Sequence, residues 1–166
     1  CNWDTTGVTP GTYYVYGVVS DGVNSQVSAY SGGVVTIDDA PDINIDQPDG
    51  TDDEITEGDN FTVTYDLSDA DDTVNADFYY DTNGSGLDGV AISGCQDQVE
   101  GINQTCNWDT TGVASGTYYV YGVVSDGFNP QASAYSAGVV TINDAPEINI
   151  DEPDGSGDNI QEDARF

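Results

Sequence analysis

The sequence repeats itself at a distance of 105 residues, and this repeat limits the possible folds more than any other feature. Residues 1–50 align without gaps on residues 106–155, with 41 identical positions out of 50. The opening Cys-Asn-Trp-Asp-Thr-Thr-Gly-Val returns unchanged at 106–113. A unit of this length can hold a hydrophobic core of its own. We therefore expect separately folded domains along the chain rather than a solenoid of short repeats.

The repeat divides the chain into one whole unit between two partial ones. We predict that residues 1–39 are the C-terminal part of a repeat, 40–144 a complete β-sandwich repeat, and 145–166 the N-terminal strands of the next repeat. The two end pieces need further copies of the repeat to complete them, either in a longer continuous chain or by insertion of a neighbouring subunit's tail. We favour the continuous chain, because a head and a tail together still lack the counterparts of residues 62–105.

The charge balance is extreme, with 31 acidic residues against one basic residue and no histidine. A net charge of −30 at pH 7 argues against nucleic acid or an anionic membrane surface as a partner. The sequence has no apolar stretch long enough to insert in a membrane as a helix. Crowded carboxylates repel one another, which favours a setting rich in divalent cations or salt. High charge is also typical of disorder, but the dense, repeated Tyr, Val and Ile clusters argue against it.

Short runs of alternating apolar and polar residues, broken by Gly, Asp, Asn and Pro, predict β-strands throughout. In the complete repeat these runs lie at 43–45, 61–67, 74–80, 90–92, 105–108, 116–125 and 139–142. The run 116–125 is apolar on both faces and should form a central strand. Seven strands in one repeat predict an all-β fold, a seven-stranded immunoglobulin-like sandwich repeated in tandem.

Two short motifs resemble a known class of surface modules. Residues 116–121, followed by Ser125-Asp126-Gly127, resemble the penultimate strand of fibronectin type III-like repeats of bacterial or archaeal surface proteins, and Trp108-Asp109-Thr110 fits the same pattern. The linkers 38–41 and 143–146, which end in Ala-Pro, resemble the acidic junctions of cadherin-type repeats. The resemblance covers the whole repeat in outline. It implies a tandem extracellular array in which calcium could stiffen the junctions.

The three cysteines fit one disulfide in each repeat. Cys95 and Cys106 lie 11 positions apart, and Cys1 is the counterpart of Cys106. We predict a Cys95–Cys106 bond, with a pair of free thiols as the alternative. Such a bond indicates an oxidising compartment, and we expect an extracellular or cell-surface location. Three glycosylation sequons, at Asn60, Asn83 and Asn103, agree with that location.

Two groups of oxygen-bearing side chains are candidate calcium sites, and calcium is the possible cofactor. In the loop 81–88, Asp81, Asn83 and Asp88 alternate as in a shortened calcium loop, and a solvated Asn-Gly turn is the alternative. At the junction, acids of the linker and of two loops would converge, and a hydrated hinge is the alternative. These acids are Asp38, Asp39, Asp69, Asp71, Asp72 and Asp126.

The sequence predicts a structural protein and no enzyme, since it lacks His, Lys, a nucleophile motif and a phosphate-binding loop. Tyr14, Tyr16, Tyr119 and Tyr121 alternate with core positions and are candidate interface residues, with cross-strand packing as the alternative. We expect a repeat of an extracellular surface polymer, a filament, stalk or adhesin shaft. Its partners would be further copies of the repeat, with glycans possible. The alternative is a spacer or carbohydrate-binding module attached to a secreted enzyme.

Overall fold

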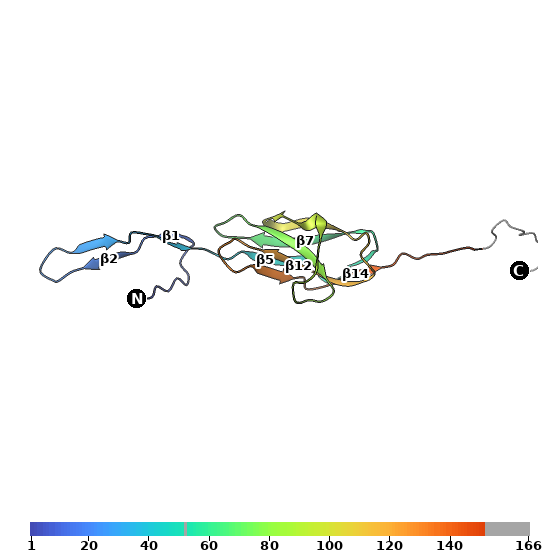
Figure 1. Ribbon diagram of the computed structural model, residues 1–166, viewed down its shortest axis with the longest axis horizontal. Helices are drawn as coiled ribbons and strands as arrows, with labels where there is room; N and C mark the ends of the chain where they lie inside the picture. The colour runs from blue at the N-terminus through green and yellow to red at the C-terminus, as the bar shows by residue number, and fades with distance from the viewer. Residues whose placement is uncertain (52, 152–166) are drawn as a thin grey trace, which may run out of the picture.

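The computed structural model describes residues 1–51 and 53–151, and a β-sandwich lies at the middle of an elongated molecule (Figure 1). The N-terminal segment extends from one end of the sandwich, and residues 144–151 run away from the opposite end. In this part of the chain the helical structure is one 3₁₀ turn, η1 (Ser93–Cys95). None of it has the length and hydrophobicity that a membrane-spanning helix needs. The predicted all-β fold is confirmed.

Two sheets form the sandwich. The first has the antiparallel order β11 (Gly101–Asp109), β7 (Asn60–Ser68), β5 (Asp42–Gln47). The second has the order β10 (Gln98–Val99), β8 (Asn75–Asp81), β12 (Gly116–Val124), β14 (Val140–Asn143), β6 (Glu54–Thr56). In it β9 (Val90–Ala91) also pairs with β8, and β13 (Ala132–Tyr135) with β12. Each predicted run overlaps one of these strands. The parallel β6–β14 pair shows that the chain changes sheet between β5 and β6.

Alternating side chains of both sheets build one core. Strand β7 buries every second residue from Phe61 to Leu67, as expected for a strand with one solvated face. Trp108 is 1% exposed. Its ring stacks on Tyr80 at a centroid distance of 4.8 Å and meets Tyr118 edge-on at 6.1 Å. These aromatic contacts join strands of different sheets.

Strand β12 is central, as the sequence predicts, because it pairs with β8, β13 and β14. Its residue Gly122 lies where the two sheets approach each other closely. A Cβ at this position would be 2.5 Å from Ile43 Cδ1 and 2.8 Å from a ring carbon of Phe78. Only a hydrogen atom fits there without movement of the neighbouring side chains.

The structure contains the Cys95–Cys106 disulfide that the sequence predicts. It joins η1 to β11 across a Cα–Cα distance of 5.3 Å, and both residues belong to the hydrophobic core. Cys1 is exposed and has no disulfide partner among the described residues.

Residues 1–37 form hairpins that reproduce the pairing of residues 106–142. The pairs are β1 (Gly11–Tyr13) with β4 (Val35–Ile37) and β2 (Tyr16–Val19) with β3 (Val27–Tyr30). Gly11 faces Ile37 as Gly116 faces Ile142, so the register is kept at the repeat distance. Each of these hairpins forms a separate two-stranded sheet in the described chain. The pairing of this half is therefore the same as that of residues 106–142.

Residues 145–151 form no strand, although the sequence predicts the first strands of a further repeat from 145 onward. Strand β5, the counterpart of this stretch, is held by its pairing with β7. Residues 145–151 have no such partner among the described residues. The remainder of the predicted segment, 152–166, lies outside the described residues.

Candidate functional site: the acidic junction

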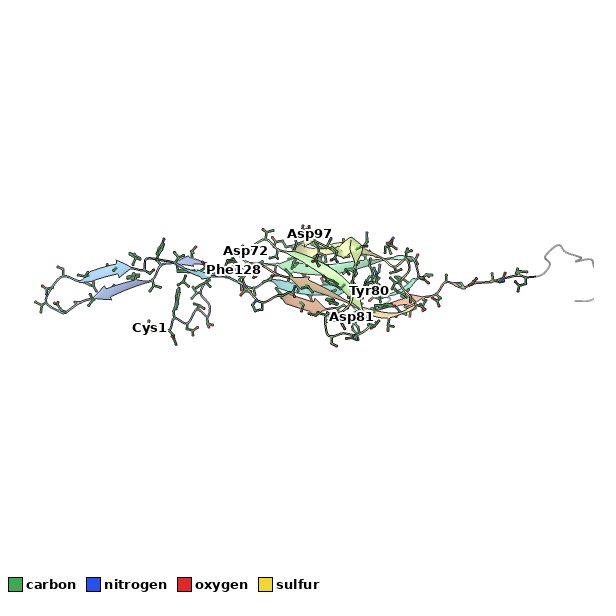
Figure 2. All side chains as sticks on the ribbon, viewed as in Figure 1. Cys1, Asp72, Tyr80, Asp81, Asp97 and Phe128 are labelled. Carbon is green, nitrogen blue, oxygen red and sulfur yellow. A yellow bond between two sulfur atoms is a disulfide. The ribbon has the colours of Figure 1, made fainter. Side chains whose placement is uncertain are left out.

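The candidate site lies where residues 38–41 join β4 to β5. Figure 2 places Asp72 and Phe128 at the end of the sandwich that faces the N-terminal segment. The loops β7–β8 and β12–β13, which carry these residues, flank the linker. Pro41 is buried and fixes the point at which the linker enters the sandwich.

The side-chain amide of Asn129 binds the linker. Its Nδ2 donates to Asp38 Oδ2 at 2.7 Å, to the carbonyl oxygen of Asp39 at 2.9 Å, and to Asp126 Oδ2 at 2.9 Å. On the other side, the Asp39 backbone N–H donates to Asp71 Oδ1 at 3.2 Å. Both loops therefore hold the linker. Sequence reasoning missed Asn129, because its partners lie 90 and 91 positions away.

The loop that carries Asn129 forms by local rules. Asp126 Oδ1 accepts hydrogen bonds from the backbone N–H groups of Phe128 and Asn129, which is the usual way that Asp closes a tight turn. The counterpart loop has the same bonds from Val23 and Asn24 to Asp21. In both loops the Asn amide also donates to the Asp carboxylate. The amide is therefore oriented by its own loop, independently of the linker.

A second loop contributes a buried carboxylate oxygen. Asp69 Oδ1 accepts hydrogen bonds from the backbone N–H groups of Asp71 and Asp72, each at 3.1 Å. Asp69 Oδ2 is buried and has no hydrogen-bond partner among the described residues. A buried carboxylate oxygen without a partner is costly. This atom is thus the least satisfied anionic group of the junction.

The charges of the junction act on Asp38. Burial raises the pKa of its carboxyl group, and the negative charges of neighbouring acids raise it further; these are Asp71, Asp126, Asp72 and Asp69. The pKa of Asp126 is lowered instead, and the main cause is the hydrogen bond from the Asn129 side chain. The structure therefore brings these five predicted acids together. Asp39 contributes its backbone groups, while its Oδ1 accepts from the next residue in the chain.

The acids of the junction are close enough to repel one another but do not form a coordination shell. Among residues 1–51 and 53–151, no group of three or more acidic or cysteine side chains is positioned to hold a metal ion. Calcium takes six to eight oxygen ligands at about 2.3–2.6 Å, so binding here would require the carboxylates to move closer together.

The second predicted calcium site, the loop 81–88, is organised by protein groups. Asp81 is 6% exposed, and its Oδ1 accepts from the backbone N–H and the side-chain amide of Asn83. Its Oδ2 accepts from the Tyr135 hydroxyl at 2.9 Å, and that hydroxyl accepts from Leu87 N–H at 3.0 Å. Asp88 is exposed. The positive φ values of the loop lie at Gly86 and Leu87, so the contacts are not those of a two-residue Asn-Gly turn. Calcium binding by this loop stays a prediction.

The predicted interface tyrosines have different environments. Tyr121 is 2% exposed, because its ring stacks on Tyr79 across the β8–β12 pair at 5.0 Å and its hydroxyl accepts from Gly89 N–H. This burial corrects the expectation that Tyr121 is an exposed interface residue, and it matches the cross-strand alternative. Tyr119 is partly buried, whereas Tyr14 and Tyr16 are 62% and 61% exposed. Their role in an interface stays a prediction.

The three sequons lie on exposed residues, Asn60 and Asn103 on strands β7 and β11 and Asn83 in the loop after β8. Asn83 is engaged in its turn, since its Oδ1 accepts from the backbone N–H and the hydroxyl of Ser85. Asn103 lies at the irregularity in β11, with a φ of 53°. Glycosylation of these residues stays a prediction.

Comparison with known proteins gives similarity in fold at most. No family model matches the chain, and no curated protein matches it. Similar solved structures include the fibronectin(III)-like modules of CbhA from Clostridium thermocellum (15% identity, TM-score 0.45, covering 83% of this chain and 65% of that one). They also include domains 4 and 5 of the S-layer protein SbsC (15% identity, TM-score 0.32, covering 81% and 66%). This chain thus spans just under two thirds of either, and function has to be argued from its own residues.

Proposed function

We propose that this chain is a structural module of an extracellular surface polymer, a filament, stalk or adhesin shaft, in which sandwiches follow one another through short fixed linkers. The observation that carries the proposal is the pair of hydrogen bonds that the Asn129 side chain donates to Asp38 and to the carbonyl oxygen of Asp39. A linker that only spans the distance between two domains can be flexible and does not require such hydrogen bonds. A linker held by both flanking loops keeps a constant angle between its neighbours, which is the property a shaft requires.

The buried polar side chains of the sandwich support a structural role. Among the residues that the structure describes, the buried polar ones are Asp81, Thr110 and Ser136. The Thr110 hydroxyl donates to the carbonyl oxygen of Asp59 at 2.7 Å. The Ser136 hydroxyl donates to the carbonyl oxygen of Gly138 and accepts from Val120 N–H. Each of these groups joins parts of the fold, and the proposal assigns no reaction to any of them.

The other features of the chain agree with an extracellular shaft. The disulfide in the core suits an oxidising compartment, and the large negative charge keeps neighbouring chains soluble and apart. A spacer beside a secreted enzyme would use the same linker contacts. A carbohydrate-binding role would need exposed aromatic side chains; Tyr121 is buried, whereas Tyr14 and Tyr16 are exposed.

Hydrogen exchange at the linker tests the proposal. The Asp39 amide donates to Asp71 Oδ1, so its exchange rate reports whether the linker is held. The variant Asn129→Ala removes both linker contacts, and we expect the Asp39 amide to exchange at least about 5-fold faster, since one lost hydrogen bond is worth about 1 kcal/mol. Asn24→Ala is the matched control, because Asn24 bonds to Asp21 in the same kind of turn, and within residues 1–51 and 53–151 its amide contacts no linker. Equal rates in both variants and the wild type would refute a held linker.

As part of the same function we propose that calcium stiffens this junction. Three features support binding of a hard cation: the unsatisfied Asp69 Oδ2, the burial and neighbouring negative charges that raise the pKa of Asp38, and the carboxylate oxygens of the surrounding acids. Bound calcium would supply positive charge. The chain's own residues would provide the ligands by drawing the acidic loops toward the linker.

A calcium titration separates this idea from simple screening. We expect millimolar calcium, the range typical of extracellular modules, to slow exchange of the Asp39 amide, whereas sodium chloride of equal ionic strength does so much less. Asp69→Asn should weaken the calcium effect, and Asp46→Asn, on strand β5, should not. If calcium has no effect beyond that of salt, or if both variants respond alike, the calcium proposal fails while the held linker stands.

A further inference from the structure

Three tyrosines form a row across the outer face of the second sheet. Tyr79 on β8 pairs with Tyr121 on β12, and Tyr121 pairs with Tyr135 on β13. The ring centroids lie 5.0 Å apart in the first pair and 4.9 Å apart in the second. Ring packing of this kind stabilises a sheet, but it does not require the hydrogen bonds that two of the hydroxyl groups make.

The hydroxyl group of Tyr135 donates a hydrogen bond to a buried carboxylate. Its oxygen lies 2.9 Å from Asp81 Oδ2 and accepts from Leu87 N–H at 3.0 Å. Asp81 is 6% exposed, and its other oxygen, Oδ1, accepts two hydrogen bonds from Asn83. The phenolic proton of Tyr135 therefore points at a carboxylate that is screened from water.

This contact has a chemical consequence for oxidation of the Tyr135 ring. A phenol that loses one electron becomes a strong acid and gives up its proton, so a base within hydrogen-bond reach makes loss of the electron easier. Such a base has to lie at a heavy-atom distance of about 2.6–3.2 Å, and Asp81 Oδ2 meets that condition. Burial raises the pKa of the Tyr135 hydroxyl, so the proton stays on the ring until the electron leaves.

Tyr121 lies where it can couple with an oxidised Tyr135. Its hydroxyl accepts from Gly89 N–H at 3.1 Å, and Gly89 follows Leu87 by two positions. Both hydroxyl groups thus reach the same stretch of loop, which brings the hydroxyl-bearing edges of the two rings side by side. In a phenoxyl radical the unpaired electron is shared with the carbons ortho to the oxygen, and these carbons lie on the same edges. Two such radicals combine through a carbon–carbon bond.

We propose that Tyr135 is a site of one-electron oxidation, that Asp81 accepts its phenolic proton, and that oxidation joins Tyr135 to Tyr121 as a dityrosine. Each ring gives up one electron and its phenolic proton, the Tyr135 proton to Asp81 Oδ2 and the Tyr121 proton to water. One bond forms between ortho carbons, and the two ortho hydrogens then move to the oxygens and restore both phenols. The two electrons pass to an external oxidant, such as a peroxide that a haem peroxidase reduces to water.

The cross-link would tie β12 to β13 and close the hairpin whose turn carries Asn129. It would therefore add a covalent bond to the part of the sandwich that contacts the linker. The inference itself does not depend on the linker contacts or on calcium, because it uses only the tyrosine row and Asp81.

Light-driven oxidation of the full 166-residue chain tests the proposal. The probe is tris(bipyridine)ruthenium(II) in dilute protein, with pentaamminechlorocobalt(III) as the electron acceptor; two cobalt(III) ions are reduced to cobalt(II) for each dityrosine. We expect dityrosine fluorescence and a monomer that has lost two hydrogen atoms. A protease that cleaves at aspartate separates Tyr121 from Tyr135 at Asp126, so mass spectrometry of the linked peptides identifies the pair.

Variants of the carboxylate and of the row distinguish the role of Asp81 from simple packing. Asp81→Asn keeps an oxygen for the Tyr135 hydrogen bond but is a much weaker base. We expect the yield of the Tyr121–Tyr135 product to fall at least about 10-fold, since a positioned proton acceptor typically contributes about 10²–10⁴-fold. Concentrated acetate should restore part of the yield in this variant and leave the wild type unchanged. Tyr79→Phe is the control in the same row and should give the wild-type yield, whereas Tyr135→Phe should give no such product.

Three outcomes would overturn the proposal. An equal yield in Asp81→Asn, without dependence on acetate, would mean that Asp81 does not accept the proton. Cross-links confined to Tyr14 and Tyr16, which are 62% and 61% exposed, would mean that exposure alone selects the oxidised rings. A Tyr79–Tyr121 product in place of Tyr121–Tyr135 would mean that stacking, and not the carboxylate, decides which rings couple.

Discussion

Asn129 Nδ2 lies 2.7 Å from Asp38 Oδ2, although 91 positions separate the two residues. The contact links the β12–β13 loop to the linker, so one side chain joins the late part of the fold to the segment that precedes it. Asn129 also donates a hydrogen bond to Asp126. The pKa of Asp38 is raised in this environment, whereas that of Asp126 is lowered. The pKa of Asp126 therefore follows from its hydrogen bonds, and that of Asp38 from burial and the neighbouring negative charges.

The pH dependence of the junction should separate Asp126 from Asp38. The pKa of Asp126 is lowered below 3.8, chiefly by the Asn129 side chain, so its stabilising contribution is complete above that value and is lost as the pH falls through the lowered pKa. The pKa of Asp38 is raised above 3.8 by burial and neighbouring acids. Its ionisation therefore opposes folding as the pH rises through the raised pKa. NMR titration of the two carboxyl carbons should show midpoints on opposite sides of 3.8.

The variant Asn129→Ala provides the control for this titration. We expect the midpoint of Asp126 to move up toward 3.8 in this variant. Asp21 has a pKa lowered to about 2 by hydrogen bonds from Asn24 and should not change. An unchanged Asp126 midpoint would mean that the Asn129 amide does not bind its carboxylate in solution.

Removal of the core disulfide should destabilise the sandwich. Replacing Cys95 and Cys106 together by Ser releases a loop of 11 positions and leaves two hydroxyl groups in the core. We expect a loss of about 2–3 kcal/mol in the free energy of unfolding, measured by urea denaturation. Cys1→Ser, at the exposed counterpart, should leave the denaturation midpoint where it is. Equal midpoints for all three proteins would show that the bond does not contribute to stability.

The close approach of the two sheets at Gly122 predicts a large effect from a single methyl group. Gly122→Ala would place a Cβ 2.5 Å from Ile43 Cδ1, and we expect it to cost about 1–3 kcal/mol of stability. Gly17→Ala is the matched control, because that Cβ meets no atom within 4 Å in the described chain. Thermal unfolding of both variants checks this. A Gly122→Ala protein as stable as the control would contradict the tight packing of β5 on β12.

The sequence predicted the features that depend on local pattern. The alternation in β7 and the two apolar faces of β12 reflect side chains that point to opposite sides of a strand, so they can be read one strand at a time. The Cys95–Cys106 pair could be predicted because Cys1 repeats the position of Cys106. Each of these inferences needs only neighbouring residues or the repeat distance.

The features that the sequence did not predict depend on contacts between distant segments. Asn129 is indistinguishable from a turn residue, since its bond to Asp126 is local and its bonds to the linker appear only in the folded chain. Tyr121 alternates with core positions, but Gly89 and Tyr79 cover it on the outer face of the sheet. Alternation gives the face on which a side chain lies and not what else packs on that face.

The central claim, that Asn129 fixes the direction of the linker, is tested most directly by the distance between the two sides of the junction. Spin labels at Ser28 and Ser133, exposed residues on β3 and β13, report this distance by pulsed electron paramagnetic resonance when both are replaced by Cys in a Cys1→Ser background. We predict one narrow distance distribution that becomes broad in Asn129→Ala and stays narrow in Asn24→Ala. A distribution that is already broad with Asn129 present, or equally narrow without it, would contradict the account.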